Sequence, residues 1–141
     1  MKQPVLLMYN LSGDRARAIA MAAMRLKIRV RRVEPGEYGL PLAVLCGVDA
    51  AAGEVEGRMQ ASPFEDEMLA MALFPAGMMS AFLQAMRRMG IAPVALKAVL
   101  TPTNAAWDSA RLREELSRER EAILAGESAA HAAPQTTEER K

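Results

Sequence analysis

Residues 5–14 read Val-Leu-Leu-Met-Tyr-Asn-Leu-Ser-Gly-Asp, and this stretch decides the fold. The first five residues form a continuous apolar run, which is typical of a strand buried on both faces of a sheet. Asn10 ends the run, and Ser12 is a good N-cap for a helix. The stretch therefore predicts a central strand at 5–9 that turns directly into a helix over residues 15–27.

The same order of strand, break and helix returns 63 residues later in the chain. Residues 68–74 are again apolar, and residues 78–89 carry the apolar face of a second helix. Sliding one half onto the other matches six side chains: Leu6 with Leu69, Met8 with Met71, Ala18 with Ala81, Ala22 with Ala85, Arg25 with Arg88, and Ile28 with Ile91. This agreement indicates an internal duplication, with halves at about 4–34 and 67–100.

Each half ends in a further strand, at 28–33 in the first and at 94–100 in the second. Two βαβ units in series predict an α+β fold of the ferredoxin-like kind: a duplicated βαβ whose four-stranded antiparallel sheet carries two helices on one face. The two fully apolar strands would be central and parallel. The two strands that carry charge would lie at the edges.

A charged helix over about 104–124 is expected to complete a single compact domain of residues 1–125. Its apolar stripe contains Leu112, Leu116 and Ile123, and its other faces allow ion pairs between Arg and Glu. Residues 126–141 are polar, rich in Ala and without periodicity, which predicts a disordered tail. Residues 38–66 give a weaker pattern, with a short helix at 42–46 and an exposed loop after it.

The central strands are apolar on both sides, but the two repeat helices cover only one face of the sheet. The third helix, the segment around Leu42 or a second copy of the chain must cover the other face. Large exposed apolar patches are rare on monomers. The pattern therefore predicts a homodimer that forms through the open sheet face.

Composition excludes several classes of partner and cofactor. The formal net charge is +1, so no global field attracts nucleic acid or an acidic membrane. No stretch approaches the roughly 20 apolar residues of a membrane span, and no signal peptide opens the chain, which indicates a cytoplasmic protein. A structural zinc site needs about four ligands, and the chain has only Cys46 and His131 as its cysteine and histidine. We expect no metal and no cofactor.

The segment from Lys97 to Trp107 is the first candidate binding site. One account is structural: Thr103 or Asn104 caps the third helix, and Trp107 anchors that helix to the body. The other account is a pocket in which Lys97, Thr101, Thr103, Asn104 and Trp107 offer an amine, hydroxyls, an amide and an apolar wall to a small anionic molecule.

The turn at Ser12 and Gly13 is a second candidate site, for an anion. A Ser-Gly turn at a helix N-terminus presents backbone N–H groups, and Arg15 is close by. Asp14 would repel an anion, and the glycine spacing of a P-loop is absent. Helix capping is the competing account.

Two charged clusters have simpler readings as surface features. Arg29, Arg31 and Arg32 fit a solvated edge strand, because an RNA-binding sheet would need aromatic residues on its central strands. Glu65, Asp66 and Glu67 could serve a metal or act as a general base, but they also fit a solubilising flank before a strand.

The runs from Val5 to Gly13 and from Leu96 to Trp107 resemble those of a small bacterial family known only as a domain of unknown function. The resemblance covers about residues 4–120, and it implies a compact bacterial cytoplasmic domain without an assigned activity. The chain shows no Ser/His/Asp arrangement, so a non-enzymatic domain that binds a ligand or forms oligomers is expected. The alternative is an enzyme that acts on a small anionic metabolite through the segment from Lys97 to Trp107.

Overall fold

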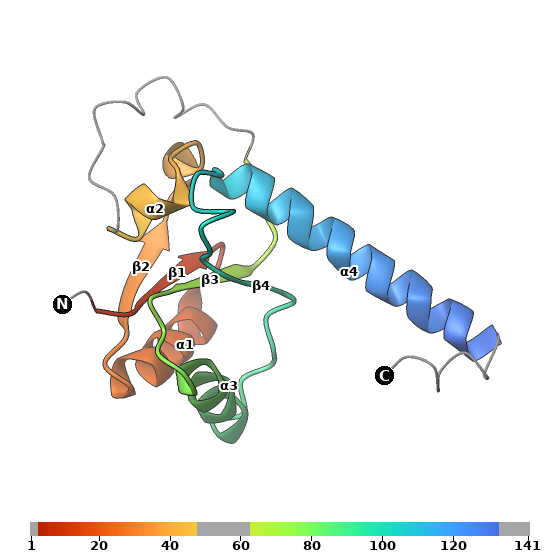
Figure 1. Cartoon of the computed structure of the whole chain (residues 1–141). Helices are drawn as coiled ribbons and strands as arrows, with labels where there is room; N and C mark the ends of the chain where they lie inside the picture. The colour runs from red at the N-terminus through yellow and green to blue at the C-terminus, as the bar shows by residue number, and fades with distance from the viewer. Residues whose placement is uncertain (1–2, 48–62, 133–141) are drawn as a thin grey trace.

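The computed structural model describes residues 3–47 and 63–132. They form a four-stranded sheet of order β2-β1-β3-β4 with helices on both faces (Figure 1). The elements are β1 (Val5–Tyr9), α1 (Gly13–Arg25), β2 (Arg29–Val33), a 3-10 helix (Pro35–Glu37), α2 (Leu42–Leu45), β3 (Met68–Ala72), α3 (Met78–Arg88), β4 (Leu96–Val99) and α4 (Ser109–Ala132).

The sheet is mixed, so the expectation of a four-stranded antiparallel, ferredoxin-like sheet is wrong. β1 pairs with β2 in parallel and β3 pairs with β4 in parallel, while the central strands β1 and β3 are antiparallel. The two strands of each βαβ unit are direct neighbours, whereas the ferredoxin-like arrangement inserts a strand of the other unit between them. An apolar run shows that a strand is buried on both faces, but it does not specify that strand's neighbours or their direction.

The two halves keep the expected 63-residue offset in their backbone. β3 begins and ends 63 positions after β1, and both repeat helices end 63 residues apart, at Arg25 and Arg88. Asn10 and Leu73, which are equivalent residues, both have positive φ angles of 60° and 63°. Leu7 lies directly opposite Ala70 in the antiparallel pairing, and these two residues are also equivalent in the repeat. A pseudo-twofold axis therefore passes between them.

The second half departs from this symmetry between its helix and its last strand. Val5 is in register with Arg29, 24 residues later, but Met68 is in register with Leu96, 28 residues later. The second unit thus has four additional residues, in the loop 91–95 that joins α3 to β4. At equivalent positions of the two sheet halves, Val30 lies beside Leu6 and Lys97 lies beside Leu69.

One face of the sheet is covered by the two repeat helices, as expected. Ile19 of α1 and Phe82 of α3 are fully buried against side chains from alternate positions of both central strands. The buried residues of this cluster are Leu6, Met8, Leu11, Ala16, Ile19, Ala22, Ala23, Ile28, Leu69, Met71, Phe82, Met86 and Val94.

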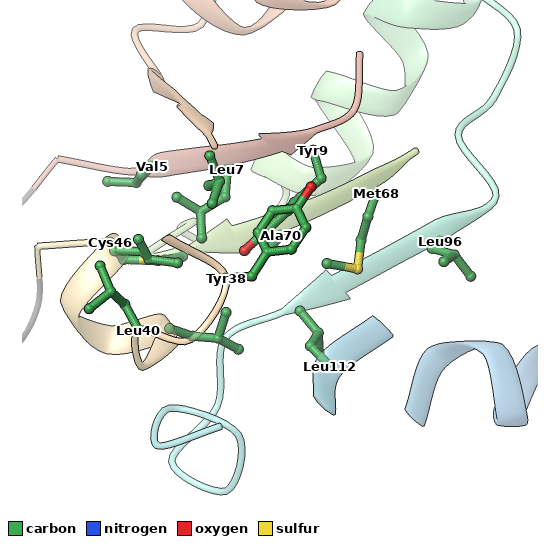
Figure 2. Packing of buried hydrophobic residues seen from close by; sticks show 14 residues of the cluster. Val5, Leu7, Tyr9, Tyr38, Leu40, Cys46, Met68, Ala70, Leu96 and Leu112 are labelled. Atoms are coloured by element: carbon green, nitrogen blue, oxygen red, sulfur yellow. The ribbon is translucent and has the colours of Figure 1, made fainter. Parts of the chain in front are cut away.

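The other face is covered by α2, the segment around Tyr38 and the first turns of α4. Figure 2 shows Leu40 and Cys46 on one side and Leu112 on the other, packed against Leu7 and Met68 of the sheet. Two of the three expected covers are therefore present within the chain. The homodimer was expected because this face seemed open, and that physical basis is absent.

The aromatic residues gather where this face meets the end of β1. Tyr38 stacks on Phe64 with ring centroids 4.4 Å apart, and Tyr9 lies 5.8 Å from Tyr38. The hydroxyl groups of Tyr9 and Ser109 are hydrogen-bonded at 2.7 Å and buried, which joins β1 to the first turn of α4. Sequence periodicity does not indicate these contacts, because they join residues far apart in the chain.

Helix α4 begins later and ends later than expected. Residues 101–107 form turns instead of helix, and Asp108 caps α4 by accepting a hydrogen bond from the backbone N–H of Arg111 at 2.8 Å. From there α4 extends away from the sheet to Ala132 (Figure 1). The exposed loop expected after Cys46 and the end of the expected tail lie outside the described residues. No helix in the described ranges is both long and apolar enough to span a bilayer.

The equivalent residues Asn10 and Leu73 allow a matched test of this fold. Asn10 donates from Nδ2 to the carbonyls of Phe64 and Asp66 at 2.9 Å and accepts from the hydroxyl of Tyr38 at 3.1 Å. Leu73 has the same strained φ angle, but its side chain is exposed. We expect Asn10→Gly to lower the free energy of unfolding by about 1–3 kcal/mol, because it removes these bonds.

We expect Leu73→Gly to raise the free energy of unfolding by up to about 1 kcal/mol, because glycine adopts positive φ without steric cost. Urea denaturation of both variants measures the two changes. Changes of the same sign would contradict this account of the two turns.

Candidate functional site: a cationic cavity beside strand β4

The segment from Lys97 to Trp107 does not form one pocket. Leu96 and Ala98 face the same side of the sheet as Trp107, and they pack with it against α4. Lys97 lies between them in the strand, so its side chain faces the opposite side, towards α3. The structure therefore separates the amine from the residues that were expected to accompany it.

Thr101 and Asn104 build a turn after β4. The side chain of Asn104 accepts from the backbone N–H of Thr101 at 2.8 Å and donates to the carbonyl of Val99 at 3.0 Å. Thr103 is exposed at the tip. Trp107 is partly buried, and the guanidinium of Arg111 lies 4.4 Å from its ring centroid. The packing of Trp107 agrees with the structural account, but Thr103 and Asn104 do not cap the third helix, because the helix begins at Ser109 and Asp108 caps it.

The second candidate, the turn at Ser12 and Gly13, has two described arginines close by, Arg15 and Arg17, and both are paired with carboxylates. Both residues are exposed, and Ser12 makes no capping bond through its side chain. Arg15 forms two hydrogen bonds to the carboxylate of Glu67, at 2.9 and 2.8 Å, and also donates to the carbonyl of Ala92 at 2.8 Å. These bonds occupy Arg15 in tying α1 to the start of β3 and to the loop before β4.

The two charged clusters also hold the fold together. Asp66 pairs with Arg113 of α4 at 2.9 Å. Arg31 pairs with Glu37 at 2.6 Å and donates to the carbonyl of Leu45 at the end of α2. Within residues 3–47 and 63–132, no group of three or more acidic, histidine or cysteine side chains could hold a metal ion.

The nucleophilic side chains of the core are kept protonated. Burial raises the pKa of the Cys46 thiol to about 11, and burial also raises the pKa of Tyr9. Both residues are almost inaccessible to solvent. Neither can act as a nucleophile near neutral pH in this conformation, because the reactive species of a thiol is the thiolate.

A cavity of about 220 Å³ lies between α3 and β4, on the side of the sheet to which Lys97 points. Its apolar wall comes from α3 and from the loop with the four additional residues, and Arg87 and Lys97 supply its charge. The lining residues are Leu83, Met86, Arg87, Ile91, Pro93, Val94 and Lys97. At about 30 Å³ for each water, the volume corresponds to roughly seven water molecules.

Lys97 is the unusual residue of this cavity. Its ammonium donates to the carbonyl of Val94, and no described carboxylate pairs with it. Partial burial lowers the pKa of Lys97, and repulsion from Arg120 lowers it further. A carboxylate in the cavity would raise the pKa of Lys97 again, because an adjacent negative charge favours the ammonium form.

Sequence reasoning selected Lys97 but missed Arg87 and the cavity. A signal was present: residues 68–107 contain no Asp or Glu, and their only charges are Arg87, Arg88 and Lys97. Two of these three cations line the cavity. The repeat gives a second signal. When the four additional residues are added to the 63-residue offset, Lys97 is equivalent to the apolar Val30.

A larger cavity of about 370 Å³ lies on the other side of the loop 91–95, against α4. Asp66 and Glu67 line it, but both are paired with arginines. The remaining charges, Arg120 and Glu121, are of opposite sign and exposed on α4. This cavity offers no net charge of one sign to a ligand, so the smaller one is the better candidate.

The fold and the cavity define an α/β domain of two βαβ units, with a cavity lined by Arg87 and Lys97 in the second unit. Residues 67–123 match the model of a family described as a domain of unknown function (DUF3783). The expected resemblance to such a family is thus confirmed for this part of the chain, and the match includes every residue that lines the smaller cavity. No curated protein and no solved structure matches the chain.

The buried state of Cys46 gives a direct prediction. Because its pKa is raised to about 11 and its side chain is covered, the native protein should not react with a thiol reagent such as dithionitrobenzoate at pH 8. The protein unfolded in guanidinium should release one equivalent of chromophore within minutes. Rapid reaction of the native protein would show that α2 does not cover this face.

Proposed function

We propose that this chain is a non-enzymatic binding domain that holds a small carboxylate-bearing molecule in the cavity between α3 and β4. The observation that carries the proposal is Lys97, a partly buried ammonium without a carboxylate partner in the described structure, directed at an apolar hollow. A buried charge is costly unless it is paired. A bound carboxylate with a short apolar body would pair the charge and cover the apolar wall.

The internal repeat supports the same reading. At the position of Lys97, the first half of the chain carries Val30, which packs against the apolar cluster of α1. Valine also suits a half-buried strand better than lysine does. We therefore expect lysine at this position to be less stabilising than valine, which is the pattern of a residue that serves binding.

Binding is favoured over catalysis by the position of the nucleophilic groups that the structure describes in the core. Cys46 and Tyr9 lie in the core on the opposite face of the sheet, and the hydroxyl of Ser109 is bonded to Tyr9. The alternative is an enzyme that uses the segment from Lys97 to Trp107 on a small anionic metabolite. Such an enzyme requires the side chains of Lys97, Thr101 and Asn104 in one place. The separation of Lys97 from Thr101 and Asn104 weighs against this enzyme.

The bacterial cytoplasmic setting remains a prediction.

The decisive variant is Lys97→Val, which copies the first half of the chain. We expect it to raise the free energy of unfolding by about 0.5–1 kcal/mol, since it removes a desolvated charge and adds apolar contact. It should also abolish the thermal stabilisation that short-chain carboxylates such as hexanoate or phenylacetate give the parent. At about 100 times the dissociation constant, that stabilisation amounts to about 2.7 kcal/mol.

Arg88→Ala is the matched control, because Arg88 follows Arg87 on α3 but does not line the cavity. It should retain the full carboxylate response. Thermal denaturation of the parent and both variants, with and without each carboxylate, measures the effect. An equal response in Lys97→Val and the parent would refute the site.

A further inference from the structure

The outer edge of β4, which pairs with no other described strand, runs beside this cavity, and Asn104 occupies only the C=O of Val99 on that edge. The backbone N–H of Leu100 donates to the carbonyl of Met71 at 2.8 Å, so Leu100 faces β3. In a parallel pair, residues alternate between facing the partner strand and facing away. The N–H and C=O of Lys97 and the N–H of Val99 are therefore on the outer edge of the sheet, where no other described strand lies.

The cavity lies on the side of this edge that faces α3, and Leu83, Arg87 and Lys97 line it. Lys97 and Val99 are two residues apart, so both face α3. On α3, Met79, Leu83 and Arg87 are spaced by four residues and share the flank that adjoins the cavity. The side chains of Val99 and Met79 are 43% and 40% exposed, so both leave apolar surface uncovered beside this strand.

The charge of the cavity is of one sign. Arg87 and Lys97 line it, and no acidic residue occurs between Glu67 and Asp108. A lysine on an edge strand discourages pairing with an uncharged strand, because the charge would be buried. A strand that brings a carboxylate to the same place removes this penalty.

We propose that the ligand of the cavity is part of an extended acidic peptide that adds to β4 as a fifth strand. The inference rests on the proposed function, because the same cavity receives the carboxylate. Side chains on neighbouring strands lie side by side on one face. A Glu beside Lys97 therefore reaches the cavity, and an apolar residue two positions away packs beside Val99.

This arrangement predicts the pattern of the partner. The added segment alternates, with a Glu and an apolar residue separated by one residue on the face towards α3. Its backbone hydrogen bonds to Lys97 and Val99 supply affinity. The cavity supplies specificity for the Glu side chain, as pockets do in other cases of strand addition.

The probe is the blocked heptapeptide acetyl-Thr-Val-Thr-Glu-Thr-Val-Thr-amide. Its only charge is the Glu side chain, and a valine two residues to either side allows both strand directions. The same peptide with Gln in place of Glu is the control. Isothermal titration should detect binding of the Glu peptide that weakens at least tenfold with the Gln peptide or with the Lys97→Val protein.

Hydrogen exchange of the parent protein tests the strand itself. The peptide should slow exchange of the Lys97 and Val99 amides, while hexanoate should bind without protecting them. Val99→Pro removes one outward N–H without touching the bonds to β3, and it should lose the peptide response but keep the hexanoate response.

The outcomes separate the two proposals. Binding of hexanoate without binding of the peptide overturns the strand addition and leaves the carboxylate site standing. Failure of both ligands overturns the proposed function as well. Peptide binding that is insensitive to Lys97→Val, or that leaves the Lys97 and Val99 amides unprotected, also overturns this inference.

Discussion

The pairing of β1 with β3 is the constraint on which the rest of the structure depends. Every residue of both strands is buried, so both faces of the central pair must be covered. The repeat helices α1 and α3 cover one face by symmetry. The other face has no symmetric cover, and the chain supplies one from α2, the Tyr38 segment and α4, with the bond between Tyr9 and Ser109 holding α4 in place.

The ion pairs serve this arrangement rather than chemistry. Arg113 ties α4 to Asp66, and Arg15 ties α1 to Glu67, so both pairs join elements that are distant in sequence. Arg31 of β2 pairs with the nearby Glu37 of the 3-10 helix. All three pairs are partly exposed. Pairs of this kind contribute little individually. Among the described cations that form no ion pair, Lys97 is the one whose side chain is partly buried, whereas the others are exposed.

The candidate site arises where the internal symmetry fails. Four additional residues between α3 and β4 open a cavity, and the residue that would continue the apolar core is a lysine. A duplicated unit can keep one copy for stability while the other changes. The first unit has Val30 at the equivalent position, so the chain itself shows which residue stabilises the fold there.

The sequence alone predicted the central strands, the repeat and the helices that follow each strand, because hydrophobic period and turn residues determine them locally. It did not predict the strand order, since an apolar run is equally compatible with several neighbours. It also misplaced the companions of Lys97. Thr101 and Trp107 are near Lys97 in the chain, but alternation along β4 directs the lysine to the other face. Arg87 was missed because it is brought to Lys97 only by the packing of α3 on the sheet.

The most direct measurement of the central claim is the titration of Lys97 by NMR. The chain has four lysines, at positions 2, 27, 97 and 141, so the side-chain signals of a labelled sample are few. The account predicts that Lys97 titrates below the ordinary range of a lysine in the free protein, because burial lowers its pKa. It also predicts that the pKa of Lys97 rises when hexanoate is bound. A Lys97 that titrates as an ordinary solvent-exposed lysine and does not respond to the carboxylate would contradict the account.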